Sequence, residues 1–369
     1  TIILAGGVGT RLWPASLRRH PKQLLRIGGG RSLIQRAVGL ALAATEGLVV
    51  VVTGEDHVDG IVAHVTELAA GHPGLPGRMV YLAEPAGRNT APAIALAARY
   101  LELELGESMT ALVLTADHVI GPQDRFAADA AAASRLAADG RLVCFGITPD
   151  RPEAGSSVDG GFIVEGFTEK PDRATALRYL DEGGYYWNSG MFCFAVGRFL
   201  EELAEHAPEL ARPFSELPAI PTEGGAGGAR FADPEKLAPL YGRLPKISVD
   251  YAVMEKSRRV AMVPASFDWN DVGSWDQAAA VAEGAEGAGG GAAAGAAAGA
   301  ADERKTATVI EVDAQGNYVD SELPVAICGV SGIHVVVRNG KVLVCRRGEG
   351  QLVKHVVEAA ESRGRDDLL

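Results

Sequence analysis

Apolar runs of strand length alternate with amphipathic stretches of helix length over the first 150 residues. The two kinds of segment follow one another as TIILA, 32–44, LVVVVT, 57–70, MVYLA, 90–104, ALVLTA, 123–138 and LVCFGI. This alternation predicts right-handed βαβ units and a mostly parallel sheet that helices cover on both faces. Runs such as VVVV and ALVLTA are apolar throughout, as expected for strands buried on both sides. We therefore expect an α/β fold.

The alternation is lost in the second part of the chain, which ends in short β-rich runs. FIVEGFTEKP and GMFCFAV are typical of strands around a polar, aromatic loop, and we interpret the half that contains them as a lid or substrate half of one large domain. Residues 284–301 are almost all Gly and Ala, which favours a linker or a surface loop, with an Ala-rich helix as the alternative. We predict a large domain over 1–283, a linker over 284–302, and a small all-β module with a terminal helix over 303–369.

The first 45 residues carry seven basic side chains and no acidic one, in a chain whose formal net charge is −12. The basic residues are Arg11, Arg18, Arg19, Lys22, Arg26, Arg31 and Arg36. This local excess predicts a site for a polyanion. The acidity of the remainder argues against nucleic acid as a partner and favours a small anionic substrate, because the field of the basic patch is focused into one cleft.

The sequence shows neither a membrane span nor a disulfide framework. It contains no run of 18 or more apolar residues and no basic leader before an apolar stretch, so we expect an untargeted chain without membrane contact. Cys144, Cys193, Cys328 and Cys345 are far apart and form no CxxC pair. This spacing favours buried thiols in a reducing cytoplasm over disulfides or zinc ligands.

A glycine turn follows the first apolar run. It carries Gly6, Gly7 and Gly9. Glycine lets a backbone approach a phosphate chain and present N–H donors, although an ordinary tight turn is the alternative. A dinucleotide fingerprint fits badly because Leu12 stands where its third glycine would be, and a Walker A loop is excluded because no GK[ST] follows. The turn instead supplies two cations, Arg11 and Lys22, at the mouth of one strand.

Two aspartates follow strand-like or packed segments at points suited to a metal ion. Asp117 comes directly after ALVLTA, and the carboxyl ends of strands in an open parallel sheet form the ligand crevice. Mg²⁺ takes one or two protein carboxylates and completes its shell with phosphate oxygens and water. Asp271 lies between two tryptophans in WNDVGSW and is the best second ligand. The alternatives are a helix N-cap for Asp117 and a turn residue for Asp271.

Further polar residues lie where predicted strands and helices begin or end. Glu169 and Lys170 close a strand-like run in FTEKP, and Asn188 precedes another in WNSGM. Loop-end residues on a rigid scaffold commonly bind ligands, although Lys170 taken alone is more typical of a solvated surface lysine. The segment EPAGRNTAPAIALA places Arg88 and Asn89 at a predicted helix start, where free N–H groups would face an anion or a base edge.

Eight sequence blocks together resemble one enzyme family. In chain order they are LAGGVGTRLWP, PKQ, EPAGRNTAPAIALA, TADHVI, FTEKP, WNSGMF, SVDYAVMEK and WNDVGSW. The glycine-rich block is similar to that of sugar nucleotidyltransferases in general, and PKQ, GRNTAPA, WNSGMF and SVDYAVMEK are similar to the mannose-1-phosphate guanylyltransferases, also called GDP-mannose pyrophosphorylases. The resemblance covers residues 1–276 and continues weakly over 307–361.

The resemblance implies a Rossmann-like nucleotidyltransferase domain with a mixed, mostly parallel sheet, followed by a small left-handed β-helix module. It implies transfer of GMP from GTP to mannose 1-phosphate, with Mg²⁺ as cofactor. The implied nucleotide contacts are Ala5, Gly6, Gly7, Gly9, Thr10, Arg11, Lys22, Glu84, Gly87, Arg88 and Asn89. The implied sugar-phosphate contacts are Glu169, Lys170 and Asn188. The implied catalytic residues are Arg11, Lys22, Asp117 and Asp271, of which the two aspartates would hold the metal.

One departure from the family concerns the sugar. GSSVDGGF at 155–162 stands where the family usually has a Gly-Tyr-Gly-Tyr stretch. A nucleotidyltransferase for another sugar 1-phosphate or another nucleotide is therefore an alternative, and a catalytically silent homologue that binds nucleotide sugars is a second. The β-rich tail has strand edges that could join two copies, which makes a homodimer a further prediction.

Overall fold

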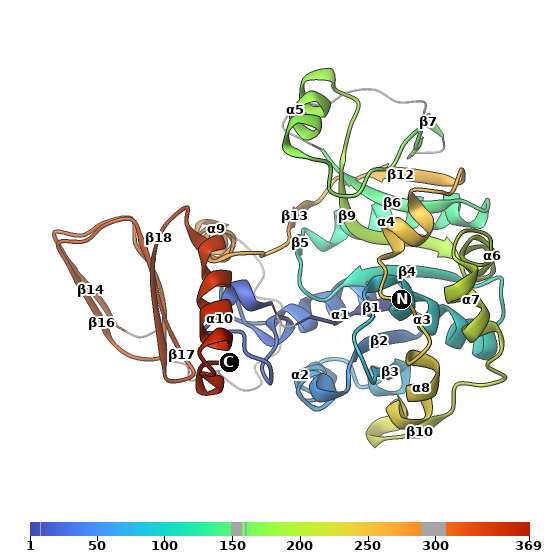
Figure 1. Cartoon of the computed structure of the whole chain (residues 1–369), viewed down its shortest axis with the longest axis horizontal. Coiled ribbons are helices and arrows are strands. Elements are labelled where there is room, and N and C mark those ends of the chain that lie inside the picture. Colours follow the sequence, from blue (N-terminus) through green and yellow to red (C-terminus); the bar gives the residue numbers. More distant parts are fainter. Residues whose placement is uncertain (8, 149–156, 159–160, 289–307) are drawn as a thin grey trace.

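A mixed sheet of 11 strands forms the core of the larger part of the molecule, on the right in Figure 1. The computed structural model describes residues 1–7, 9–148, 157–158, 161–288 and 308–369. The strands of the sheet are β1 (Ile2–Leu4), β2 (Val49–Gly54), β3 (Met79–Glu84), β4 (Thr110–Thr115), β6 (Leu142–Ile147), β7 (Ser157–Val158), β8 (Gly161–Ile163), β9 (Trp187–Ala195), β10 (Thr222–Gly224), β11 (Arg230–Ala232) and β12 (Val260–Pro264). Their order across the sheet is β10-β11-β3-β2-β1-β4-β9-β6-β12-β8-β7.

The four helices predicted from the alternating pattern are all present. They are α1 (Leu33–Ala44), α2 (Val58–Ala69), α3 (Thr90–Leu105) and α4 (Gln123–Ala138). A capping box starts α1, in which the Ser32 side chain accepts from the Gln35 backbone N–H and the Gln35 side chain accepts in return from the Ser32 backbone. Two of the four orphan N–H groups of a helix start are satisfied in this way. The predicted α/β fold is confirmed.

One strand interrupts the parallel part of the sheet. Strands β3, β2, β1 and β4 pair in parallel, whereas β9 lies antiparallel between β4 and β6. The antiparallel register aligns Thr110 with Ala195 and Val113 with Phe192. Because β9 runs opposite to β4, its first residues lie at the edge of the sheet where β4 ends. The chain segment around Asn188 is thereby placed beside the segment that follows Thr115.

Helices cover both faces of the sheet, as strands with continuous apolar runs require. The remaining helices of this domain are α5 (Arg173–Glu182), α6 (Val196–His206), α7 (Pro208–Ser215), α8 (Pro234–Tyr241) and a π-helical turn over Asp250–Met254. One core cluster joins the sheet to α3, α6, α7 and α8, and a second joins it to α1, α2 and α4. Within the described part of the chain, no helix has the length and apolar character needed to cross a bilayer.

The C-terminal part of the chain, here called the C-terminal module, is rich in β-strands. A strand pair, β5 (Val119–Gly121) with β13 (Asp268–Asn270), and helix α9 (Trp275–Ala288) lead toward it (Figure 1). Its elements are β14 (Val309–Val312), β15 (Tyr318–Ser321), β16 (Val325–Cys328), β17 (Ile333–Arg338), β18 (Lys341–Arg346) and α10 (Val353–Ser362). Parallel pairing joins β14 to β16 and β15 to β17, which is compatible with the predicted β-helix; the left-handed sense stays a prediction.

The predicted end of the large domain falls inside helix α9. This helix continues to Ala288, five positions beyond the predicted end of the large domain at 283. The rest of the predicted linker lies outside the described residues, as do positions 155–156 and 159–160 of the GSSVDGGF segment. The three-part division of the chain therefore stays a proposal.

The cysteines follow the prediction in part. Cys144 and Cys193 are buried in the sheet, and burial raises the pKa of each thiol to about 12. The expectation of buried thiols is wrong for Cys328, which is exposed at the end of β16, and Cys345 is half-buried. Both lie in the small module, whose strands are too few to enclose every side chain. All four cysteines are free thiols.

Candidate active site

The carboxyl ends of the parallel strands meet at one edge, and the predicted site residues follow them. The glycine turn follows β1, Glu84 is the last residue of β3, and Asp117 comes two positions after β4. Two buried side chains hold the backbone at the start of the glycine turn, because the Ala5 carbonyl accepts hydrogen bonds from Gln23 Nε2 (2.6 Å) and Thr53 Oγ1 (2.9 Å). This edge is the ligand crevice that an open α/β sheet provides.

A pocket of about 210 Å³ opens above the glycine turn. It is lined by Gly6, Gly7, Gly9, Arg11, Leu12, Lys22, Gln23, Asp117, Val272 and Gly273. Gly9 has a φ of 72°, and a Cβ atom built on it would lie 2.5 Å from Lys22 Cβ. No side chain fits at this position, because the conformation is left-handed and the space is already filled. The glycine turn is thus shaped to keep Lys22 close to the backbone.

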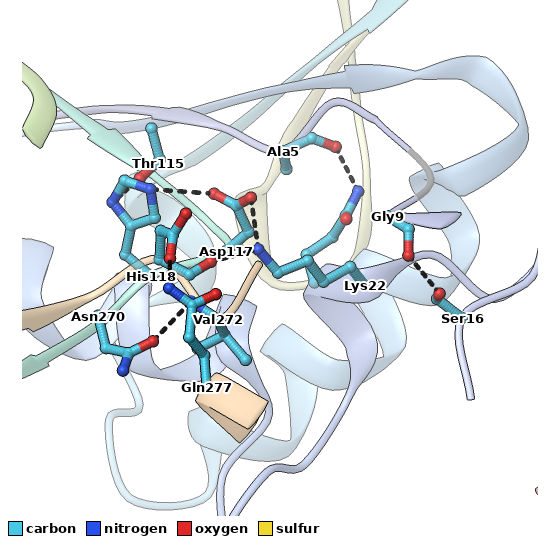
Figure 2. A network of polar contacts seen from close by, with 12 residues as sticks. Ala5, Gly9, Ser16, Lys22, Thr115, Asp117, His118, Asn270, Val272 and Gln277 are labelled. Atoms are coloured by element: carbon cyan, nitrogen blue, oxygen red, sulfur yellow. Dashed lines mark hydrogen bonds and ion pairs between the residues drawn. The ribbon is translucent and has the colours of Figure 1, made fainter. Parts of the chain in front are cut away.

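Lys22 joins two loops that are far apart in the sequence. Its side chain is 8% exposed, and Nζ lies 2.8 Å from Asp117 Oδ2, 95 positions away. The same Nζ donates to the backbone carbonyl of Asp271 (2.6 Å), 249 positions away. Figure 2 shows the ammonium group between these loops, beside the glycine turn. Lys22, Asp117 and the Asp271 loop therefore form one cluster.

The Asp117 carboxylate is held in its charged form. Burial raises its pKa, but the charges of His118 and Lys22 and the Lys22 hydrogen bond outweigh burial and bring the pKa below its usual range. His118 Nε2 lies 3.6 Å from Asp117 Oδ1. A negative oxygen donor at this position is available to a divalent cation at neutral pH.

His118 is a site residue that the sequence analysis missed, although its block TADHVI was among those that carried the resemblance. Its Nδ1 accepts from Trp269 Nε1 (3.1 Å) and lies 2.6 Å from Thr115 Oγ1, so its N–H points toward Asp117. Burial lowers the pKa of His118 below its usual value, although the Asp117 charge acts against this. The His118 ring therefore lies beside the Asp117 carboxylate and faces it with Nε2.

The Asp271 side chain is held by its own loop. Gln277 Nε2 donates to Asp271 Oδ1 (2.5 Å). Val272 has a φ of 44°, and its backbone N–H donates to Asn270 Oδ1 (2.7 Å). A Cβ atom on Gly273 would lie 3.0 Å from Asp271 Oδ2, so the glycine lets the carboxylate lie against the turn. The backbone of Asp271, rather than its carboxylate, binds Lys22. Gln277 was not predicted, because nothing in the sequence marks it beyond its position six residues after Asp271.

The basic residues of the N-terminal segment do not act together. Of the seven, Arg11 and Lys22 line the pocket. Arg18 forms an ion pair with Glu361 (3.2 Å) and Arg26 one with Glu67 (2.5 Å). Net charge along a segment shows the sign of the local field, but only folding decides which side chains point into the cleft.

Glu84 lies at the β3 end of the same edge. It is 7% exposed, and Tyr241 Oη donates to its Oε1 (3.2 Å). Burial raises the pKa of Glu84 to about 7, although the Tyr241 hydrogen bond acts against this. Asn89 has a φ of 72° and caps α3 through its side chain, which accepts from the Thr90 backbone. Gly87 and Arg88 complete the segment between β3 and α3.

The predicted nucleotide residues divide into two groups in space. Gly6, Gly7, Gly9, Arg11 and Lys22 line the glycine pocket, while Ala5 supports it from below through its carbonyl. Thr10 is exposed at the start of the short helix that carries Arg11. The remaining predicted residues lie at the β3 end, outside the residues that line the pocket: Glu84, Gly87, Arg88 and Asn89.

A second polar cluster lies where β9 begins. Asn188 Nδ2 donates to Asp250 Oδ1 (3.0 Å), and its Oδ1 accepts from the Gly190 backbone (3.1 Å). Burial, followed by the charge of Glu169, raises the pKa of Asp250 to about 6. Lys170 Nζ lies 2.5 Å from Glu169 Oε1 and is 81% exposed, which is the surface position that the residue type favours. The structure brings Glu169, Lys170 and Asn188 into one neighbourhood and adds Asp250, which the sequence analysis did not assign.

The residues present fit a hard divalent cation. Among the described residues, no three His, Cys, Asp or Glu side chains converge as a metal centre. Mg²⁺ does not require such a centre, because it is usually held by one or two carboxylates together with substrate phosphates and water. The oxygen donors that could serve it are the carboxylates of Asp117, which lines the pocket, and of Asp271, which lies against Gly273 of the same lining. Oxygen donors of this kind are the ligands that such a cation prefers.

Comparison with known proteins gives consistent matches over the whole chain. The family described as nucleotidyl transferase matches residues 1–286. The chain is 38% identical over 372 residues to the xanthan biosynthesis protein XanB of Xanthomonas campestris pv. campestris (strain B100), covering 99% of this chain and 74% of that relative. It is 36% identical over 384 residues to a mannose-1-phosphate guanylyltransferase of Escherichia coli (strain K12), again covering 99% and 74%.

A solved structure is also similar to this chain. It is described as a mannose-1-phosphate geranyltransferase from Thermus thermophilus, and it matches with a TM-score of 0.75 at 29% identity. The match covers 98% of this chain and 98% of that chain. Both the large domain and the C-terminal module are therefore included in the similarity.

Proposed function

Because the chain belongs to the nucleotidyl transferase family, we propose that it transfers GMP from GTP to mannose 1-phosphate, giving GDP-mannose and pyrophosphate. The observation that carries this proposal is the convergence of Lys22, Asp117 and the Asp271 loop on the glycine pocket. A relative that is 36% identical over 99% of the chain is named for the same reaction. A catalytically silent homologue would have no physical need to keep this charged cluster.

The proposed step is an in-line displacement at the α-phosphorus of GTP. An oxygen of mannose 1-phosphate forms the new P–O bond while the bond to pyrophosphate breaks. A phosphate monoester has a second pKa near 6 and is mostly dianionic at neutral pH, so the nucleophile needs no general base. Catalysis then consists of aligning two anions and neutralising the charge that develops during transfer.

The residues of the glycine pocket would bind the nucleotide. Backbone N–H groups of the glycine turn face the phosphates, and Arg11 and Lys22 supply positive charge beside them. Asp117 and Asp271 would hold Mg²⁺, which, when bound, neutralises phosphate charge and helps to orient the triphosphate. Lys22 then keeps the two aspartate loops together through its contacts with Asp117 and the Asp271 carbonyl.

The cluster at the start of β9 would bind the sugar phosphate. Lys170 is exposed and can pair with the phosphate, whereas Asn188 and Glu169 offer polar atoms to the sugar hydroxyls. The register between β4 and β9 supports this role, because it places the cluster at the same sheet edge as Asp117. The nucleophile would thus arrive from the β9 side and the nucleotide from the β1 side.

A substrate panel tests the proposed function. The purified chain is incubated with Mg²⁺ and each pairing of GTP, ATP, UTP or dTTP with mannose 1-phosphate or glucose 1-phosphate, and pyrophosphate release is measured. We expect kcat/KM to be highest for GTP with mannose 1-phosphate. A clear preference for another pair would replace the proposed substrates within the same reaction class. Release from no pair, by a chain that still binds GTP, would support the silent homologue instead.

The buried Asp250 carboxylate gives a prediction for stability. Its raised pKa means that ionised Asp250 disfavours the folded state, and this cost grows as the pH rises from about 4 to about 6. Asp250→Asn removes the charge and can still accept from Asn188, so we expect Tm at pH 8 to rise by about 2 °C or more. The gain should be small near pH 4, because the aspartate is then protonated in the folded chain and about half protonated in the unfolded chain.

Differential scanning fluorimetry at pH 4, 6 and 8 measures this effect. Asp181→Asn, at an exposed position of α5, is the matched control and should leave Tm unchanged. An equal gain in Tm at pH 4 and pH 8 would show that the effect does not come from the ionisation of Asp250. The same variant should raise KM for mannose 1-phosphate more than KM for GTP, because Asp250 lies in the sugar cluster.

A further inference from the structure

The C-terminal module contacts the glycine pocket directly. Arg11, which lines the pocket, donates from Nη1 to Gln351 Oε1 (3.3 Å), 340 positions later in the chain. Gln351 belongs to a short helical turn over Gly350–Leu352, immediately before α10. No other hydrogen bond of the Arg11 side chain is found among the described residues, so Gln351 is its one protein partner there.

A second contact joins the same turn to the start of α9, which follows the loop that carries Asp271. The Asp276 carboxylate accepts from the backbone N–H groups of Gly348 (2.6 Å) and Gly350 (3.0 Å) and from His334 Nε2 (2.8 Å). Burial raises the pKa of Asp276, but these three donors outweigh it and hold the pKa below its usual value. One carboxylate therefore ties the start of α9 to the module with three hydrogen bonds.

The approach between the turn and α9 is close. A Cβ atom on Gly350 would lie 2.6 Å from Asp276 Oδ2 and 3.3 Å from Ser274 Cβ, so only glycine fits there without a shift. The residue after Asp276 is Gln277, whose side chain holds the Asp271 carboxylate (2.5 Å). A displacement of the turn would consequently move both Arg11 and the support of Asp271.

An apolar core fixes the module in this place. Its buried residues include members from the Arg11 segment, from α9 and from the module, among them Leu12, Trp13, Trp275, Val336, Val353 and Val357. The indole N–H of Trp13 donates to the Leu368 carbonyl (2.7 Å), and that of Trp275 donates to the Trp13 carbonyl (2.9 Å). A shared core of this kind behaves as one packed unit rather than as two bodies in loose contact.

We propose that the C-terminal module helps to shape the nucleotide site through two contacts. Gln351 positions the Arg11 side chain, and the backbone of Gly348 and Gly350 positions the Asp271 loop through its hydrogen bonds to Asp276. Gln351 acts through Arg11 and is a positioning residue, not a catalytic one. The inference rests on the proposed function only for the assay of turnover. Binding of GTP tests it separately.

A double-mutant cycle between Arg11 and Gln351 tests the first contact. For wild type, Arg11→Ala, Gln351→Ala and the double variant, kcat/KM for GTP and Kd for GTP in the presence of Mg²⁺ are measured. We expect Gln351→Ala to lower kcat/KM about 5- to 10-fold, mainly through KM for GTP, and to change it less than about twofold when Arg11 is already alanine. Equal losses from Gln351→Ala in both backgrounds would overturn the proposal, as would a loss below twofold in the wild-type background.

Gly350→Ala tests the second contact from the side of the module. The added methyl group should push the turn away from Asp276, raising KM and Kd for GTP about fivefold while KM for mannose 1-phosphate changes less than about twofold. Glu361→Gln is the matched control, because it removes an exposed ion pair with Arg18 between the same two parts of the chain, away from the pocket. An unchanged KM for GTP in folded Gly350→Ala, or an equal rise in Glu361→Gln, would contradict the proposal.

These tests separate the inference from the proposed function. A wild-type chain without turnover in the substrate panel would overturn the proposed reaction, whereas the Kd cycle would still report whether Gln351 acts through Arg11. If the chain makes GDP-mannose but Gln351→Ala changes Kd for GTP equally with Arg11 in place and in the Arg11→Ala background, the inference is overturned and the proposed reaction stands. Tm of each variant shows whether the fold is kept.

Discussion

Lys22→Met is expected to lower kcat/KM about 10³-fold, the largest effect predicted for a single substitution in this chain. Lys22 is buried, and its Nζ both neutralises Asp117 and binds the Asp271 carbonyl, so the variant loses a phosphate-facing charge and the link between two loops. Methionine keeps most of the length and apolar stem of lysine and removes only the charge and the donors.

Steady-state kinetics with varied GTP measure this effect. Arg19→Met is the matched control, because Arg19 belongs to the same basic segment and is exposed, and it should retain kcat/KM within about twofold. The pH profile adds a second readout, since the Asp117 carboxylate without Lys22 should titrate at a higher pH than in the wild type. Near-normal turnover of folded Lys22→Met would contradict the assigned role.

Asp271→Asn is expected to lower kcat about 10²- to 10³-fold, with the effect greatest at limiting Mg²⁺. Asparagine keeps the size of the side chain and an oxygen that can accept from Gln277, whereas the negative charge that a divalent cation requires is lost. The backbone carbonyl that binds Lys22 is unchanged, so the loop should stay in place.

The measurement is kcat as a function of Mg²⁺ concentration, together with Tm. Asp268→Asn is the matched control, since Asp268 is an exposed aspartate three positions earlier, on β13. It should behave as the wild type at every Mg²⁺ concentration. Equal kcat values for Asp271→Asn and wild type at limiting Mg²⁺ would remove Asp271 from the proposed metal site and leave Asp117 as its one predicted carboxylate.

The role of Glu84 illustrates what residue order alone could anticipate. Its block EPAGRNTAPAIALA predicted a polar segment before a helix, and α3 does begin at Thr90 after an Asn89 cap. The burial of Glu84 and its partner Tyr241, 157 positions later, could not be anticipated. Local sequence gives the ends of elements because caps and apolar periodicity act over a few residues.

Three further predictions concern the oligomeric state, the cellular location and the sugar substrate. The homodimer and the cytoplasmic location depend on partners and surroundings, and these two and the identity of the sugar stay predictions. The GSSVDGGF segment, on which the sugar prediction depends most, lies partly outside the described residues. The substrate panel addresses the sugar directly.

The sequence by itself determined the alternating strands and helices, the glycine turn with its two cations, and the β-rich tail, because each is encoded by neighbouring residues. Tertiary structure decided which of seven basic residues enter the pocket, that β9 brings Asn188 to the edge where β4 ends, and that Gln351 meets Arg11. The physical reason is that these contacts depend on how distant segments pack around shared cores. Side-chain periodicity reports only on neighbouring residues and cannot identify a partner hundreds of positions away.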